Sequence, residues 1–241
     1  MKSCDTTHLL LLIPEDFIFI KQNQSLADEK QGKDGSDSAS LAASFFLDEI
    51  KDTLISGLIY SNFESILKSG PFKVYGDDEM SRFMHLGTKS YIIRIAQIEL
   101  DEFIIPYTAS EQFDTLTYYE DFNLNAVSVN MWMEVTEVNG TQDTSQVLYS
   151  KEQISDVVEG YFTKSFSGMV KYVYQRTDIN LDNIYKMSTD FGEMNAHYLF
   201  DYFMNKYIHE RYKGNKAPKY YHFDGATGNI YPAGYYRFIF L

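Results

Sequence analysis

One long alternating segment limits the possible folds of this chain more than any other feature. Between Phe122 and Val138, apolar side chains recur at every second position, namely at Val127, Val129, Met131, Met133 and Val135. A period of two predicts a strand with one buried face. Asn139-Gly140 follows directly, and both residues tolerate the positive φ of a tight hairpin turn. We therefore expect an antiparallel partner strand over Gln146–Gln153.

Two other segments have helical spacing. The first runs from Leu41 to Leu67, with apolar residues at Phe45, Phe46, Ile50, Leu54, Leu58 and Ile66. Ser36, Asp37 and Ser38 are available to cap its start, and Ser69-Gly70-Pro71 predicts its end. The second runs from Leu181 to Tyr212, with a stripe at Met187, Phe191, Met194, Tyr198, Tyr202 and Met204. Gly214 is well placed to end this second helix.

The remaining segments predict further strands. We expect strands over His8–Ile20, interrupted at Pro14, over Phe72–Tyr75, and over Tyr91–Ile105, ended by Pro106. In the last of these, Ile93 and Ile95 would share one face, with Ile92 and Ile98 on the other. A final hairpin is expected over Tyr220–Leu241, with its turn at Asp224-Gly225 or Gly228-Asn229 and a last strand from Arg237. Residues 154–177 show no clear pattern.

This order of elements predicts an α+β fold. The natural arrangement is a mainly antiparallel sheet with the two long helices packed on one face. We expect an N-terminal tether over residues 1–7 and an α+β domain over residues 8–218. The polar segment 21–40 predicts a mobile loop within that domain. Residues 219–241 would form a C-terminal aromatic hairpin packed on the same domain.

Charge and hydropathy exclude two classes of partner. The net charge of −13 opposes nucleic-acid binding, which relies on Lys and Arg to neutralise phosphates. The sequence shows no basic cluster suited to anionic lipid. Its longest strongly apolar stretch, Leu9–Ile13, is far shorter than the roughly 20 residues of a membrane helix. We therefore expect membrane attachment, if any, only through a covalent lipid.

Catalytic motifs are absent from the sequence, and no cofactor is expected. It contains no GxSxG nucleophile elbow, no phosphate-binding glycine loop and no HExxH or CxxC motif. Glu193, His197 and Asp201 fall at i, i+4 and i+8 on the second predicted helix, a spacing that could hold Zn²⁺. The solvated face of an amphipathic helix gives the same pattern. Clustered carboxylates, such as Asp77-Asp78-Glu79, leave a glycosidase open as an alternative.

The C-terminal hairpin is rich in aromatic residues. Five tyrosines form a candidate partner or ligand surface: Tyr220, Tyr221, Tyr231, Tyr235 and Tyr236. On a hairpin, alternate members face the same way, so one row is expected to be buried and another exposed. An exposed tyrosine row could stack on sugar rings or dock a protein, whereas a buried row would be core.

Cys4 is the only cysteine in the chain, so no intramolecular disulfide can form. A bacterial lipoprotein is cut just before a cysteine that then carries lipid, and Ser3-Cys4 is a candidate for that position. Met1-Lys2 cannot serve as a signal sequence, so the cysteine is either the lipidation site of a chain that lost its leader or incidental.

Several features together resemble small envelope lipoproteins. Ser3-Cys4, the strand ending at Ile13-Pro14, the first long helix and the strand Phe72–Tyr75 follow the order of transport-auxiliary and Tol-type lipoprotein domains. The Tyr- and Asn-rich composition resembles Bacteroidota sequences. This resemblance covers residues 4–212. It implies a non-catalytic protein, tethered by lipid on Cys4 to the periplasmic side of the outer membrane, that docks an envelope complex.

We therefore expect a binding or assembly subunit of a cell-envelope complex, whose partner is an envelope protein complex or a glycan. A hydrolase acting on a glycan or peptide, with a metal on Glu193, His197 and Asp201, is the first alternative. A cytosolic accessory protein is the second.

Overall fold

The computed structural model describes residues 7–12, 18–24, 46–86, 89–138, 145–211, 220–225, 227–235 and 237–241, with the backbone only for residues 18–24. Cys4, Pro14, Asn139-Gly140, Gly214 and Tyr236 therefore lie outside the described residues. The predictions made for these positions stay predictions.

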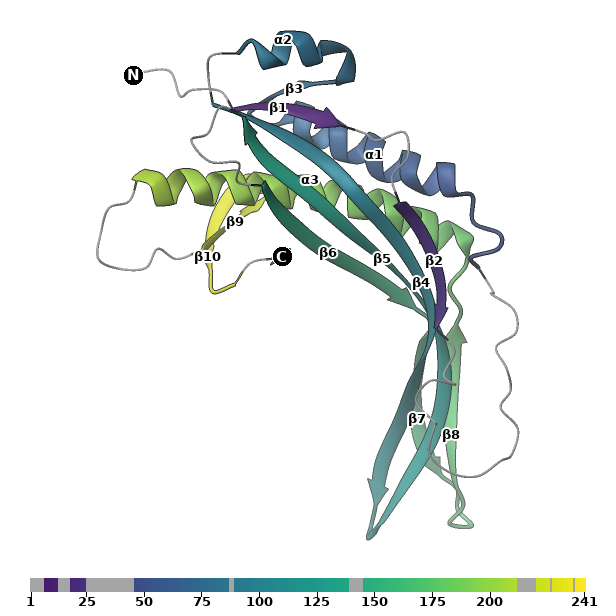
Figure 1. The fold of residues 1–241 in the computed structure, drawn as a ribbon. Helices are drawn as coiled ribbons and strands as arrows, with labels where there is room; N and C mark the ends of the chain where they lie inside the picture. Colours follow the sequence, from purple (N-terminus) through teal and green to yellow (C-terminus); the bar gives the residue numbers. More distant parts are fainter. Residues whose placement is uncertain are drawn as a thin grey trace.

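The core of the fold is a twisted mixed sheet with strand order β11-β6-β5-β4-β1-β3 (Figure 1). Its antiparallel part consists of β4 (Ser90–Phe113), β5 (Leu116–Val138), β6 (Ser145–Ser155) and β11 (Ile239–Phe240). Its parallel part consists of β1 (Thr7–Leu12) and β3 (Phe72–Tyr75). β2 (Ile18–Gln24) pairs parallel with β4 beyond the end of β1. The α+β class is confirmed, whereas the parallel pairings were not predicted.

Two long helices lie side by side on one face of the sheet (Figure 1). Residues of α1 (Asp52–Ser69) and α3 (Leu181–Arg211) pack with the apolar rows of β4 and β5 in two contiguous clusters. Val127, Val129, Met131, Met133 and Val135 are all buried there, so the predicted face of β5 is confirmed. The opposite face is covered at one end by α2 (Met80–Met84), where Phe83 packs on Leu10 and Tyr75.

The two long helices come into backbone contact at Gly192. A Cβ built on Gly192 would lie 2.3 Å from the carbonyl oxygen of Ile59. Ile59 and Phe191 are themselves completely buried beside this contact. Because only a residue without a side chain permits this approach, the separation of α1 and α3 is set at Gly192.

The second predicted helix is confirmed over Leu181–Arg211, but the first was predicted too long. The α1 helix begins at Asp52, after Lys51 in an extended conformation. Residues before it form a turn, in which the Glu102 carboxylate accepts hydrogen bonds from the backbone N–H groups of Phe46 and Leu47. Leu47 and Ile50 are buried by this turn, so these apolar residues belong to the core although they do not lie on a helix.

The prediction that Pro106 ends its strand is wrong. β4 continues to Phe113, and Pro106 lies opposite Asn123 of β5. The pairing of β2 with β4 stops at Phe103, so no described strand lies on that side of β4 at Pro106. A missing N–H on that side breaks no ladder bond between the described strands, which makes a proline compatible with the strand there.

The predicted faces of β4 are also partly wrong. A register shift between Ile95 and Gln97 inserts an extra residue, and this bulge puts Ile98 on the same buried face as Ile95. The shift falls between the stretch of β4 that pairs with β1 and the stretch that pairs with β2. The prediction of a loop over residues 21–40 is wrong for residues 21–24, which belong to β2. Residues 25–40 lie outside the described residues.

Two hairpins complete the chain. β7 (Val157–Lys164) and β8 (Val170–Thr177) form a two-stranded sheet within residues 154–177, for which no structure was predicted. β9 (Tyr220–Asp224) and β10 (Asn229–Ala233) form the expected C-terminal hairpin. The Asp201 carboxylate on α3 holds this hairpin through the Phe223 N–H and the Arg237 guanidinium. The predicted last strand is reduced to Ile239–Phe240.

Candidate functional site

Two hairpins project together from the body of the molecule (Figure 1). The first consists of residues 104–125, where β4 and β5 continue past the last pairings with β2 and β6. The second is β7–β8. We call these residues, 104–125 and 157–177, the arm.

The two hairpins of the arm pack through aromatic rings. Phe122 lies with its ring centroid 4.9 Å from that of Tyr174 and 5.7 Å from that of Tyr172. Phe162 packs on Tyr172 and is buried, and Leu124 is buried nearer the sheet. The arm therefore has a small core of its own that holds both hairpins as one unit.

Polar contacts close the arm at both ends. At the base, the buried Asp156 carboxylate bonds to Asn125, Arg176 and the N–H of Ile179. At the tip, the Lys164 ammonium donates to the Asp114 carboxylate at 2.8 Å. Asp114 occupies the two-residue turn between β4 and β5 and has a φ of 55°. Aspartate is among the residues that tolerate this left-handed conformation.

The tip contact gives a test of the packing between the hairpins. The hydrogen bond and charge of Lys164 lower the pKa of the Asp114 carboxyl, so the contact is present above the ordinary pKa of aspartate and is lost as the pH falls through the lowered value. We expect Lys164→Ala to raise the Asp114 pKa toward its ordinary value, as measured by an NMR pH titration. Lys171→Ala, on the same hairpin, should leave it unchanged. An Asp114 pKa that does not respond to Lys164→Ala would contradict the packing of the tips.

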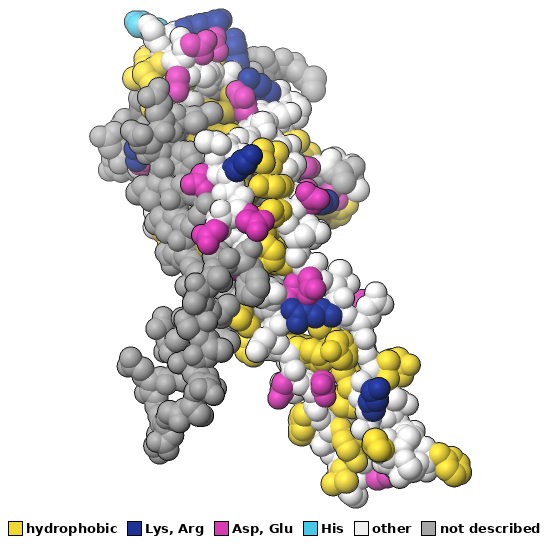
Figure 2. Space-filling model, turned by 90° about the vertical axis from the view of Figure 1, so that its right-hand side faces the viewer, with side chains coloured by type: hydrophobic (Ala, Val, Ile, Leu, Met, Phe, Trp, Pro, Cys, Tyr) yellow, Lys and Arg dark blue, Asp and Glu magenta, His cyan; other side chains and the backbone are white. Residues whose placement is uncertain are grey.

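The surface of the arm carries exposed apolar side chains (Figure 2). Phe166 is fully exposed and Met169 is 70% exposed, both in the turn between β7 and β8. Other exposed apolar residues follow along the arm: Tyr107, Leu116, Tyr119, Val157, Tyr161, Val173 and Tyr174. Contiguous apolar surface of this kind marks interaction sites in soluble proteins.

The turn that presents Phe166 is an ordered structure. The N–H of Ser165 donates to the carbonyl of Met169, and the Met169 N–H donates to the Ser165 hydroxyl. Gly168 has a φ of 84°, which closes the turn. Phe166 and Met169 are therefore held outward by the backbone. Sequence reasoning missed this site, although Ser165–Gly168 lies between two runs rich in Val, Thr and Tyr, the typical signal of a hairpin.

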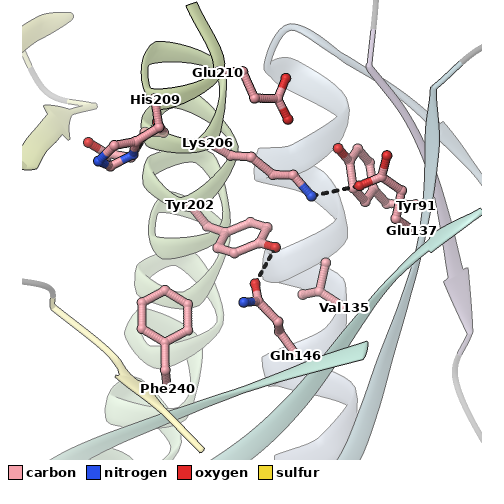
Figure 3. A pocket seen from close by; sticks show the side chains of 10 residues that line it. Tyr91, Val135, Glu137, Gln146, Tyr202, Lys206, His209, Glu210 and Phe240 are labelled. Atoms are coloured by element: carbon pink, nitrogen blue, oxygen red, sulfur yellow. Dashed lines mark hydrogen bonds and ion pairs between the residues drawn. The ribbon is translucent and has the colours of Figure 1, made fainter. Parts of the chain in front are cut away.

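A second feature is a cavity of about 380 Å³ at the C-terminal end of α3 (Figure 3). Its charged groups are paired: the Lys206 ammonium contacts Glu137 at 2.7 Å, and Glu210 is bonded to Lys89. Burial, with Glu137 and Glu210 adding to it, raises the pKa of Tyr91, and burial raises that of Tyr202 to about 12. Both phenols therefore stay protonated at neutral pH.

The polar side chains of this cavity are bonded to neighbouring groups. The ten residues that line it include no serine, threonine or cysteine. The Tyr202 hydroxyl donates to the Gln146 side chain at 2.6 Å, and the His209 Nδ1 lies 2.8 Å from the Asn205 carbonyl oxygen. The polar groups thus satisfy one another and join α3 to the sheet.

The third feature is a cavity of about 560 Å³ between the end of α1, the middle of α3 and β9. We call it the phenylalanine pocket, because Phe72, Phe200 and Phe223 line it. Glu193 and His197 also line it, on the α3 side.

The structure does not assemble the predicted metal site. Asp201 is fully buried, and its two oxygens accept hydrogen bonds from Phe223 and Arg237. Within the described part of the chain, no group of three or more His, Cys, Asp or Glu residues is placed to hold a metal ion. The view that all three residues form a solvated face is also wrong for Asp201, because β9 and Arg237 cover it.

The five tyrosines predicted as a surface have different environments. Tyr220 is only 6% exposed, so its assignment to a partner surface is wrong. Tyr221 is partly buried against Asn205, which accepts its N–H. Tyr231 and Tyr235 are exposed, the latter by 72%. Tyr236 lies outside the described residues.

Comparison with known proteins gives no family. No family model matches the sequence, and no curated protein matches it. Among the described residues, no helix combines the length and apolar character needed to cross a bilayer.

Proposed function

We propose that this protein is a non-catalytic docking or assembly subunit that engages a protein partner through its arm. The observation that carries the proposal is the ordered turn at the arm tip, which holds Phe166 and Met169 in solvent. Large apolar side chains at such positions contribute nothing to the core of the chain. They are the residue types that anchor protein interfaces when a partner covers them.

The charges of the arm favour a protein partner over an anionic membrane. Besides the Asp114–Lys164 pair, the arm carries four acidic residues, Glu111, Glu120, Asp121 and Glu159. Lys171 and Arg176 are its other basic residues, and Arg176 is bonded to Asp156 and Asp178. An acidic arm is repelled by anionic lipid and attracted by a basic protein surface. We infer a partner with an apolar groove flanked by Lys and Arg.

The other functions expected from the sequence have less support. The metal-dependent hydrolase would need Asp201 as a metal ligand, but the Asp201 carboxylate is paired with Arg237. The lipid anchor on Cys4 and the envelope location stay predictions, because Cys4 lies outside the described residues. An arm that docks a partner is compatible with either location.

The arm can be tested directly. A photoreactive phenylalanine analogue at position 166 should crosslink to one protein in the native host, and the same analogue at exposed Ile230 on β10 should not. With that partner purified, Phe166→Ser combined with Met169→Ser should weaken binding about 30-fold, equivalent to roughly 2 kcal/mol. Calorimetric titration measures the affinity, and Ile230→Ser is the matched control.

Two outcomes would contradict the proposal. One is an affinity for the crosslinked protein that the paired serine substitutions leave unchanged. The other is flotation of the protein with lipid vesicles that depends on Phe166 and Met169, which would assign the arm to a membrane surface. The circular dichroism spectrum should be the same for all variants, because both side chains lie outside the arm core.

A further inference from the structure

We propose that the phenylalanine pocket binds a small organic cation, of the quaternary or alkylated ammonium class. Its volume of about 560 Å³ falls within the range of small-molecule sites, roughly 300–1,000 Å³. This inference does not depend on the docking function of the arm. It rests on the aromatic rings, the carboxylate and the helix end that meet in this pocket.

The aromatic wall comes from three separate elements. Phe72 begins β3, Phe200 lies on α3 and Phe223 lies on β9. The ring of Phe200 lies 4.5 Å from that of Phe223 and 5.9 Å from that of Phe72, measured between centroids. All three rings are partly exposed, so each presents surface to the pocket. Aromatic rings grouped in this way attract cations through their negative faces.

The electrostatics of the pocket favour positive charge. Glu193 is its one carboxylate, and no lysine or arginine lines it. No salt bridge engages Glu193 within the described part of the chain. The carboxylate is therefore available to a ligand at the pocket edge. Asp201, two turns further along α3, is not available, because Arg237 holds it.

A helix end adds to this negative potential. α1 ends at Ser69, and Ile66, Ser69 and Gly70 line the pocket. The C-terminal end of a helix carries a partial negative charge from its aligned peptide dipoles. Lys68 is the basic residue of this last turn, but its ammonium is paired with Glu64 at 2.8 Å. The helix end thus faces the pocket without a lysine or arginine in the lining.

His197 lines the pocket as well, in addition to the three phenylalanines, Glu193 and the end of α1. Its ring packs against Gly225, where an added Cβ would lie 2.3 Å from the ring Cε1, and makes an edge contact with Phe223. The imidazole is therefore held in place as part of the wall. An ammonium ligand would place its charge between Glu193 and the phenylalanine faces, with its apolar part over Ala196 and Pro71.

The test uses choline and its neutral isostere 3,3-dimethyl-1-butanol as probes, followed by NMR of the Gly225 and Ala196 amides. We expect saturable shifts with choline and at least tenfold weaker binding of the alcohol. Glu193→Gln should weaken choline binding about fivefold to tenfold. Asp182→Asn, the same charge change in the first turn of α3, should have no effect. Phe223→Leu, which keeps an apolar side chain, should also weaken binding.

Equal binding of the two probes, or choline binding unchanged by Glu193→Gln, would overturn the proposal. Absence of saturable shifts with choline would do the same. A parallel experiment presents the same ammonium group on phosphatidylcholine vesicles. Glu193-dependent binding to vesicles would identify a lipid headgroup as the source of the ligand, and binding of free choline alone would identify a soluble ammonium compound.

Discussion

Replacing Gly192 with alanine should lower the free energy of unfolding by about 2 kcal/mol, although alanine is the better helix former. The new Cβ would lie 2.3 Å from the carbonyl oxygen of Ile59 and 3.0 Å from its carbonyl carbon. Both atoms belong to the backbone of α1, so no side-chain rotation can relieve the contact. Overpacking of this kind costs about 1–3 kcal/mol, and sometimes more. The gain in helix propensity, about 1 kcal/mol, offsets only part of this.

Gly57 provides the matched control for this substitution. It is an exposed glycine in α1, and no atom lies within 4 Å of the Cβ that alanine would add. Gly57→Ala should therefore raise the free energy of unfolding by about 0.5–1 kcal/mol through helix propensity alone. Urea denaturation of both variants gives the comparison. Equal effects of the two substitutions would show that the helices are not in contact at Gly192.

Periodic patterns correctly predicted the elements whose buried side chains recur at a regular spacing along the sequence. The alternation of β5 and the stripe of α3 each report one face that a single neighbouring layer covers. The same reasoning misplaced Ile98, because one bulged residue in β4 shifts every later side chain to the other face. It also ended β4 at Pro106, since a sequence does not show on which side a strand is paired at a given residue, and there β4 pairs with β5 through Asn123.

The site depends on contacts between distant segments, which local patterns do not contain. Glu193 and Asp201 look alike in the sequence, because both fall on one face of the predicted helix. Glu193 lines a pocket, whereas Asp201 is buried, because Phe223 of β9 and Arg237 bond to Asp201. Tyr220 and Tyr235 likewise look alike in the sequence, yet Tyr220 is buried and Tyr235 is exposed. The arm was missed because its apolar residues look like core residues until the structure shows that nothing among the described residues packs on Phe166.

Replacing Asp156 with alanine should have the largest effect of any single substitution considered for this protein. Its side chain is completely buried, and its Oδ2 accepts hydrogen bonds from Asn125 and, at 2.6 Å, from Arg176. Its Oδ1 accepts the N–H of Ile179 at 2.9 Å. The alanine variant leaves the N–H groups of Asn125 and Ile179 without this acceptor, whereas Arg176 is 33% exposed and keeps its contact with Asp178. Each buried donor left unsatisfied costs about 1–3 kcal/mol, and we expect a total loss of about 3–5 kcal/mol from the two N–H groups and the lost ion pair.

Asp156 lies where β6, the arm and the start of α3 meet, so the loss should be felt first at the base of the arm. We expect hydrogen exchange to speed up at Asn125 and Ile179 before it does so in the sheet core. Asp178→Ala is the control, because it removes the other carboxylate on Arg176 but is 67% exposed. Exposed pairs contribute about 0–1 kcal/mol, so this variant should stay near the parent in urea denaturation. If Asp156→Ala proves as stable as Asp178→Ala, the arm is not anchored through Asp156, and its orientation on the sheet must be held by the aromatic core around Phe122 alone.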